Sequence, residues 1–442
     1  MLATTATAAP RDLGSGWEYR WGDSPFLADD TPAWTLPGND DAWQSIGFPS
    51  NPPHREGREH VWFRVTLPAG EWRDPVVYIY SIDLIAEAYL GGERIYRYGA
   101  FDANGEGRFA GWPWHMITLP QDTAGQRLYL RVYSDYTDIG LWGEIKLMER
   151  AELFGYILRH SVAALVVGPL CLLLALLAGS FAVIQTERRS FAAIALFGLA
   201  AGTMILAESQ ASQLLLDAPL LWDYLTAGGY FTIPIALGLL LEHWFADTRP
   251  QLIRRIWQGH LGYLIAALGS AGLGWIDLVA TFPVFDALLV ASLVLLLLAI
   301  APKLRRLNRH QQAILATFAV FGVLLLVDMA VAHGLLPWRR VPVSVGALAF
   351  ALAIMAISLL DYNHTQRELK RLNQHLETEV AARTYQLQSL VERLETYSYT
   401  DPLTGLHNRR YFDELLRYEA HQAQRLGASL ALAMIDIDHF KR

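Results

Sequence analysis

Seven apolar segments separated by short loops constrain the fold more than any other feature of this sequence. Two of them, Ser161–Ile184 and Val341–Leu360, contain no Asp, Glu, Lys or Arg. A helix that crosses about 30 Å of hydrocarbon needs about 20 such residues, so both are long enough. We therefore expect a seven-helix transmembrane bundle over residues 155–360. The other five segments are shorter or carry one acidic residue, and they lie near Phe191–Ala207, Leu225–Trp244, Trp257–Ile276, Thr281–Ala301 and Ala313–Ala332.

The charge of the connecting loops alternates along this block. The loops after the first, third and fifth segments hold nine Lys and Arg residues, whereas those after the second, fourth and sixth hold only Arg339 and Arg340. Basic loops stay on the cytoplasmic side of a membrane. This predicts that the residues before Ser161 are external and that those after Leu360 are cytoplasmic. A soluble helical domain would not segregate charge in this way.

The composition narrows the range of partners. Hydrophobic residues make up 53% of the chain, and its formal net charge is −7. Without a basic cluster outside the membrane loops, this balance argues against a nucleic-acid partner. The single cysteine, Cys171, lies in the first apolar segment, so the external region has no disulfide and folds on its own core.

Residues 15–150 have the pattern of an all-β sandwich. Short β-branched and aromatic runs such as Val61–Val65 and Val76–Tyr80 alternate with turn sequences such as Gly91-Gly92. The preceding residues 1–14 are expected to be a signal remnant or disordered, since Ala6-Thr7-Ala8 looks like a cleavage site without a basic or apolar region before it. Either the true start lies further upstream, which we favour, or the first membrane helix directs export.

The runs Trp62-Phe63-Arg64, Glu87–Gly92 and Leu130–Tyr133 resemble the galactose-binding-like jelly-roll over most of residues 40–148. The family usually has Asn-Gly where this chain has Gly91-Gly92. The resemblance implies an external ligand, for which a carbohydrate is one candidate. Four aromatic residues can either stack on a sugar ring or pack in the core, at the rim or on the membrane helices; they are Trp112, Trp114, Tyr136 and Trp142.

Four acidic residues lie in or near the apolar segments: Glu208, Glu242, Asp286 and Asp328. Charges at membrane depth are costly and often functional. Because these four lie mostly near segment ends, we expect structural or interfacial roles. The sequence shows no internal repeat or interrupted helix, which disfavours a transporter.

A seven-residue period follows over residues 361–398. One core position holds Asn373, Val380, Leu387 and Leu394, and the other holds Leu369, Leu376, Arg383, Leu390 and Tyr397. This pattern predicts a parallel coiled-coil dimer, in which Asn373 selects the register and Arg383 is a weak point. The stretch Leu376–Leu387 resembles the signalling helices of bacterial sensors; a plain spacer coil is the alternative.

The most specific motifs lie in residues 399–442. The first is Asp401–Arg410 (DPLTGLHNRR), and the second begins at Asp436 with the sequence DIDHFK. Pro402 and Gly405 stop the incoming helix, residues 408–424 have helical spacing, and Leu430–Ile435 is an apolar run typical of a strand buried on both faces. Both motifs resemble the start of a GGDEF domain, the diguanylate cyclase module.

This resemblance implies a ferredoxin-like α/β fold and assigns roles to several residues. Asp436 is the expected ligand of Mg²⁺ (or Mn²⁺), and the Phe440–Lys441 turn is expected to bind the phosphates of GTP. Structural or hinge roles are expected for Asp438, Asn408, Asp401 and Arg410, the last two as a salt bridge. The sequence ends at Arg442, before the GGDEF hairpin. We therefore expect it to be an incomplete record of a longer protein, and inactive as written.

The layout as a whole resembles the bacterial seven-transmembrane receptors with diverse intracellular signalling modules. The resemblance implies a multi-pass protein of the bacterial inner membrane, in contact with lipid, with its N-terminal domain in the periplasm. An external or membrane ligand would bring two cyclase domains together in a homodimer, each holding one GTP, to form cyclic di-GMP. The alternatives are a non-enzymatic receptor with a degenerate output domain and a transport protein with a regulatory tail.

Overall fold

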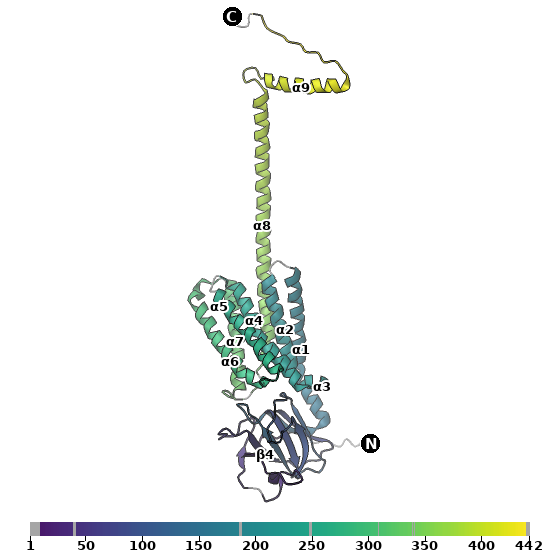
Figure 1. The fold of residues 1–442 in the computed structure, drawn as a ribbon, viewed down its shortest axis with the longest axis vertical. Helices are drawn as coiled ribbons and strands as arrows, with labels where there is room; N and C mark the ends of the chain where they lie inside the picture. Colours follow the sequence, from purple (N-terminus) through teal and green to yellow (C-terminus); the bar gives the residue numbers. More distant parts are fainter. Residues whose placement is uncertain are drawn as a thin grey trace. The chain divides into compact units, whose positions relative to one another are not determined.

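The computed structural model describes residues 9–38, 41–184, 188–246, 250–307, 309–337, 339 and 341–438. The expected signal remnant therefore lies largely outside the described residues. The chain divides into two compact units, Met1–Asp361 and Tyr362–Arg442. The first contains a β-sandwich and most of the helices, and the second contains the end of the longest helix and the C-terminal segment (Figure 1).

The N-terminal region is a sandwich of two antiparallel sheets, as the alternating strand and turn pattern predicts. One sheet has the strand order β1-β10-β5-β8 and the other β3-β2-β4-β9-β6-β7. The strands of the described residues are β1 (Arg11–Asp12), β2 (Trp17–Trp21), β3 (Gln44–Ile46), β4 (His60–Thr66), β5 (Pro75–Ile82), β6 (Ile85–Leu90), β7 (Glu93–Tyr98), β8 (His115–Thr118), β9 (Arg127–Tyr133) and β10 (Leu141–Glu149). A short 3-10 helix, η1 (Ala33–Thr35), lies between β2 and β3.

The sandwich begins before residue 15, the boundary expected from the sequence. β1 pairs with β10, and Leu13 belongs to the core between the sheets. That core is built from inward-facing residues of both sheets, among them Trp17, Phe63 and Ile79, each less than 2% exposed. Burial of this aromatic and aliphatic surface holds the sandwich together without a disulfide.

A buried ion network ties two strands of the larger sheet to the loop after β2. The Arg131 guanidinium on β9 pairs with Glu87 on β6 at 3.2 Å, and its Nε donates to Asp23 at 2.9 Å. Arg131 and Glu87 are both nearly inaccessible to solvent. Buried charges persist only when they are paired, so this network fixes where the loop lies on the sheet.

Helices follow from Arg150 to the end of the first unit, and each of the seven predicted apolar segments overlaps one of them. They are α1 (Arg150–Ile184), α2 (Arg188–Ala207), α3 (Gln210–Leu215), α4 (Pro219–Trp244), α5 (Pro250–Gly272), α6 (Thr281–Ile300), α7 (Arg309–Ala332) and α8 (Val343–Tyr399). Short 3-10 helices, η2 (Leu278–Ala280) and η3 (Ala301–Arg306), flank α6. β10 ends at Glu149 and α1 begins at Arg150, so no linker separates the sandwich from the first helix.

Six helical segments in the described part of the chain are long and apolar enough to cross a membrane: α1, α2, α4, η2 with α6, α7 and α8. α5 is not among them. It begins with Arg254, Arg255 and Gln258 in its first turns and carries His260 further along, which lowers its mean hydropathy. The crossing of α5, and hence the count of seven, stays a prediction.

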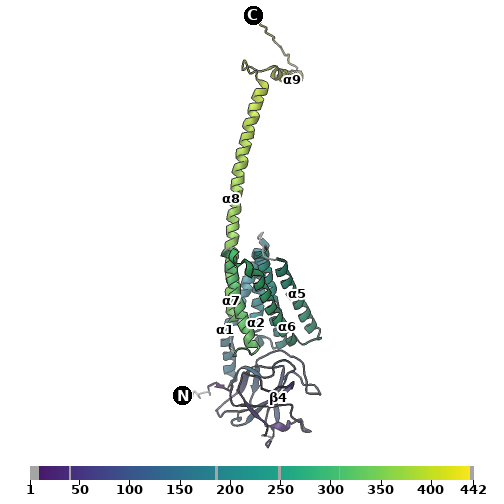
Figure 2. The same ribbon diagram turned by 90° about the vertical axis from the view of Figure 1, so that its left-hand side faces the viewer.

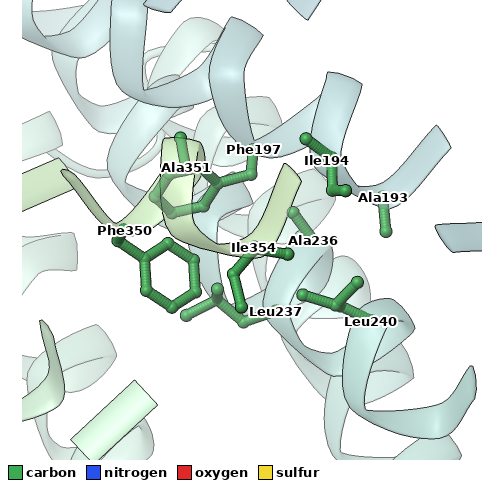
Figure 3. A pocket seen from close by; sticks show the side chains of 9 residues that line it. All are labelled: Ala193, Ile194, Phe197, Ala236, Leu237, Leu240, Phe350, Ala351 and Ile354. Carbon is green, nitrogen blue, oxygen red and sulfur yellow. The ribbon is translucent and has the colours of Figure 1, made fainter. Parts of the chain in front are cut away.

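Helices α2, α4 and the first part of α8 pack closely against one another. Figure 3 shows the apolar side chains that line a small hollow, including Ile194 and Phe197 of α2, Leu240 of α4 and Phe350 of α8. The rings of Phe197 and Phe350 lie 4.9 Å apart. The hollow has no polar side chain that would orient a ligand, so we interpret it as a small gap in the packing of the helices.

The second unit contains the end of α8 and one further helix, α9 (Arg409–Leu426). α8 continues without a break through residue 361, where the sequence suggested a domain boundary. The predicted strand Leu430–Ile435 is not formed, and Met434 and Ile435 are each 89% exposed. A central strand needs neighbours on both edges, and the second unit has no other strand among its described residues to supply them.

Candidate functional site

The first motif forms a tight turn between α8 and α9. The carboxylate of Asp401 accepts hydrogen bonds from the backbone of Leu403 (3.2 Å) and of Thr404 (2.9 Å), and from the Thr404 hydroxyl (2.8 Å). The bonds from Thr404 hold the pKa of Asp401 below its ordinary value. Gly405 adopts φ +73°, which a glycine accommodates without strain. The DPLTG sequence therefore encodes a self-contained turn.

Asn408 closes this turn and starts the next helix. Its Oδ1 accepts from the backbone of Tyr411 at 3.1 Å, which makes it the N-cap of α9. Its Nδ2 donates to the carbonyls of Ser398 (2.8 Å) and Thr400 (3.3 Å) at the end of α8. One side chain thus caps one helix and holds the end of another.

The expected salt bridge between Asp401 and Arg410 does not occur in the structure. Arg410 lies 3.5 Å from Glu414 one turn along α9, and its guanidinium lies over the ring of Tyr399. Asp401 is occupied by its own turn. Asp401 and Arg410 therefore each have partners close by in the sequence. An exposed ion pair between them would add too little stability to compensate for the loss of those contacts.

The second motif lies in an extended, solvent-exposed stretch. Asp436 and Asp438 are exposed, and Phe440 and Lys441 lie outside the described residues. A carboxylate is a ligand type that Mg²⁺ prefers, so Asp436 fits the expected ion in kind. No cluster of three His, Cys, Asp or Glu side chains in the described part of the chain is placed to hold a metal.

The heptad positions of α8 are exposed in a single chain. Asn373 and Arg383 are solvent-accessible, and Leu387 is 63% exposed. A shallow groove along the helix is lined by Leu376, Val380, Arg383, Leu387 and two neighbouring polar residues. This stripe is apolar but unburied within one chain.

A second candidate site is the junction between the β-sandwich and the membrane helices, which lie next to each other in both views (Figures 1 and 2). The Trp112 backbone donates to Asp223 of α4 at 2.7 Å, and its ring lies 5.6 Å from that of Phe282 on α6. Trp114 donates from its backbone to Gln213 and from its indole to the carbonyl of Gln210, both on α3 and both at 2.9 Å. These two tryptophans pack on the helices, as the second of the two sequence interpretations expected.

One buried cluster joins the two sides of the junction. Leu84 and Ile85 of the sandwich are fully buried in the same cluster as Phe231 of α4 and Phe285 of α6. Tyr136, another of the four candidate sugar-stacking aromatics, packs at its edge, while Trp142 donates its indole N–H to Asp83. Three of the four aromatics thus pack at the junction, and the fourth, Trp142, is hydrogen-bonded to Asp83 within the sandwich.

Asp83 is a buried carboxyl beside this cluster. Its Oδ2 accepts from the Gly140 backbone at 2.8 Å and from the Trp142 indole at 2.7 Å. Burial raises the pKa of Asp83 to about 7, and the nearby charge of Asp138 adds to the rise. The sequence pattern places Asp83 only at the end of a strand and gives no sign that it is buried.

Two of the four acidic residues of the membrane block have clear partners. Glu242 accepts two hydrogen bonds from Arg254, the shorter at 2.6 Å, and one from the Trp257 indole at 2.7 Å. Asp286 accepts from Tyr230 and lies against His333, both at 2.9 Å. These contacts link neighbouring helices and agree with structural roles. Neither Tyr230 nor His333 can be recognised as a partner from the sequence, because each is an isolated residue without a motif.

Comparison with known proteins assigns the C-terminal segment. Residues 398–442 match the family "Diguanylate cyclase, GGDEF domain". Over 43 residues the chain is 56% identical to diguanylate cyclase DgcP of Pseudomonas aeruginosa, which covers 10% of this chain and 6% of that protein. Over 49 residues it is 43% identical to the probable diguanylate cyclase DgcC of Escherichia coli K12, covering 11% and 13% respectively. The chain thus carries a GGDEF segment at its C-terminus and spans only a small part of these relatives.

Solved structures give a weaker likeness. A β-glucuronidase from an uncultured Clostridium aligns with 34% of this chain and 30% of its own, at 14% identity and a TM-score of 0.25. The Ruminococcus gnavus β-glucuronidase aligns with 31% and 28%, also at 14% identity and a TM-score of 0.25.

Replacing Asn408 by Ala should loosen the start of α9, because the helix loses its cap and α8 loses two hydrogen bonds. An N-cap contributes about 1 kcal/mol, so hydrogen exchange at residues 411–413 of the 442-residue chain should accelerate roughly fivefold. Asn408→Asp is the matched control. It keeps the capping oxygen and loses the amide donors, so α9 should stay protected while residues 398–400 exchange faster. Unchanged exchange in Asn408→Ala would show that the cap does not hold α9.

Proposed function

We propose that the protein is a membrane-bound sensor diguanylate cyclase that joins two GTP molecules into cyclic di-GMP in response to an external or membrane ligand. The observation that carries this proposal is the C-terminal segment. Both motifs occur in the family's order, and residues 398–442 match the GGDEF family. The six apolar helices and the external β-sandwich supply a membrane anchor and a domain that can bind a ligand.

The orientation follows from the loop charges. Nine basic residues against two favour a bacterial inner-membrane protein with the sandwich in the periplasm and the GGDEF segment in the cytoplasm. This arrangement requires an odd number of crossings, so α5 crosses as well as the six more apolar segments. A cytoplasmic GGDEF segment would also have access to GTP, its proposed substrate.

Catalysis needs two GTP molecules facing each other, so two chains must meet. The exposed heptad stripe of α8 supplies the surface for a second copy, since Leu376, Val380 and Leu387 lie on one face with a shallow groove between them. A parallel coiled coil would bury this stripe. In such a dimer Asn373 faces its twin and is hydrogen-bonded only in register. Arg383 weakens the same seam, which keeps the helix pair easy to rearrange on signalling.

Magnesium or manganese is the expected cofactor. We assign Asp436 as a ligand on the chemistry of its carboxylate and its place in the motif, with Phe440 and Lys441 next to the phosphates of GTP. When bound, the ion offsets negative charge at the phosphates during attack of the 3′-hydroxyl. Asp438 and Asp401 keep structural roles.

Replacing Asp436 by Asn should abolish cyclic di-GMP formation in a chain that continues through the rest of a GGDEF domain. An amide keeps the shape of the side chain but loses the charge that holds a hard cation, so we expect turnover to fall at least about 100-fold. The measurement is GTP conversion with Mg²⁺ or Mn²⁺. Asp413→Asn, which removes a carboxylate from the exposed face of α9, should retain activity. Turnover by the Asp436→Asn chain would show that this residue does not bind the metal.

Replacing Asn373 by Val should strengthen the dimer and loosen its register, because an apolar seam pairs in more than one alignment. In a Cys171→Ala background, chains carrying Val380→Cys should cross-link to each other and not to chains carrying Leu387→Cys. Asn373→Val should add the mixed product, whereas Gln374→Val, outside the seam, should not. An unchanged pattern in Asn373→Val would contradict register selection by Asn373.

A further inference from the structure

The corner between β5 and β6 links the two sheets of the sandwich to the membrane helices. β5 belongs to one sheet and β6 to the other, and only Asp83 and Leu84 lie between them. Leu84 adopts φ +50°, an unusual conformation for a leucine, and it is fully buried. With Ile85 it packs in the cluster that contains Phe231 of α4 and Phe285 of α6. This corner is therefore one of the places where the sandwich packs on the helices.

Asp83 is buried at this corner without a counter-ion. It is 4% exposed, and the two groups that donate to its carboxyl, the Gly140 N–H and the Trp142 indole N–H, are both neutral. Among the described residues no Lys, Arg or His lies within ion-pair distance of it. A buried carboxylate without a cation is costly, and the usual response is to take up a proton.

The surroundings of Asp83 are rich in acids and poor in cations. Arg55 is the basic group near this corner, and its guanidinium is occupied by the backbone carbonyls of Ser134, Tyr136 and Thr137. Its Nε donates to a fourth carbonyl, that of Arg58. The titratable groups around the junction are Asp135 and Asp138 of the β9–β10 loop, Glu59 before β4, Tyr136, Asp223 of α4, Asp277 before η2, and Asp286 of α6 with His333.

Two of these acids oppose each other across the junction. Burial raises the pKa of Asp135 in the sandwich, and the charge of Asp277 on the helix side adds to the rise. Like charges on opposite sides of a contact repel each other, so protonation of either favours the contact. Protonation of Asp135 or Asp277 would therefore strengthen the docking of the sandwich on the helices, as protonation of Asp83 would.

We propose that this junction senses external protons: protonation of Asp83 strengthens the docking of the β5–β6 corner on α4 and α6, and its ionisation weakens it. The docking itself follows from the geometry of the first unit. Its consequence for cyclic di-GMP output rests on the function proposed above.

Proton linkage gives the direction in which docking changes with pH and the pH range of that change. The ordinary pKa of an aspartate is 3.8, and burial raises that of Asp83 to about 7. The docked state therefore binds more protons than an undocked, hydrated one between these values. Docking is fully favoured below pH 3.8 and is lost as the pH rises through 7. If undocking fully hydrates Asp83, the docking constant falls roughly 20-fold between pH 5.5 and 7.5.

Hydrogen exchange of the 442-residue chain in lipid nanodiscs, without nucleotide, tests this inference. After correction for the intrinsic pH dependence of exchange, protection of the amides outside the strands, at residues 83–84 and 134–140, should fall roughly 20-fold from pH 5.5 to pH 7.5. Residues 61–65 of β4 serve as the internal reference. Asp83→Asn mimics the protonated carboxyl, so its protection should be high and change less than about twofold over the same range. Asp122→Asn, a matched change on an exposed loop, should behave like the unaltered chain.

A second variant changes a hydrogen-bond donor to the Asp83 carboxyl instead of the carboxyl itself. Trp142→Phe removes a hydrogen-bond donor that favours the carboxylate, so the loss of protection should move to higher pH. Protection that is independent of pH in the unaltered chain would overturn the proposal. So would a normal pH response in Asp83→Asn, or a shift to lower pH in Trp142→Phe. Because no step involves GTP, these outcomes leave the cyclase assignment to its own test at Asp436.

Discussion

The hydrocarbon core of a membrane leaves no water to bond with the backbone, so every peptide group that crosses it must be satisfied within its own segment. This constraint makes the apolar segments after Arg150 helical. The sandwich is connected to the first apolar helix without a linker, since β10 ends at Glu149 and α1 begins at the next residue. At the other end, α8 continues as one helix from Val343 to Tyr399. Both attachments are secondary structure and not flexible loops.

The junction between sandwich and helices combines two kinds of contact. Trp114 attaches the sandwich to α3 through neutral donors and neutral acceptors, whereas the Trp112 backbone donates to the Asp223 carboxylate on α4. The contacts of Trp114 involve no titratable group, so they do not change with pH. Asp83 differs because its charge state is not fixed by a partner. The same interface thus contains a permanent attachment and a carboxyl whose ionisation can modulate it.

Much of the architecture could be predicted because periodicity and length report directly on burial. The apolar segments and the alternating strands were found in this way, and the turn signals around Gly405 and Asn408 placed α9 correctly. The strand at Leu430–Ile435 was predicted wrongly, since an apolar run specifies a strand only where neighbouring strands exist. The aromatic residues at Trp112 and Trp114 left two interpretations open, because composition does not say which surface a ring faces. The burial of Asp83 was invisible for the same reason: it arises from contacts distant in sequence.

In the proposed topology, an odd number of membrane helices joins an external sandwich to a cytoplasmic GGDEF segment. Labelling of single cysteines with a membrane-impermeant maleimide tests it most directly, in a Cys171→Ala background. Asp122→Cys reports on the sandwich and Glu419→Cys on α9. In cells with a permeabilised outer membrane only the first should be labelled, and disruption of the inner membrane should expose the second. Labelling of both positions in cells with an intact inner membrane would place the two ends on the same side and contradict the account.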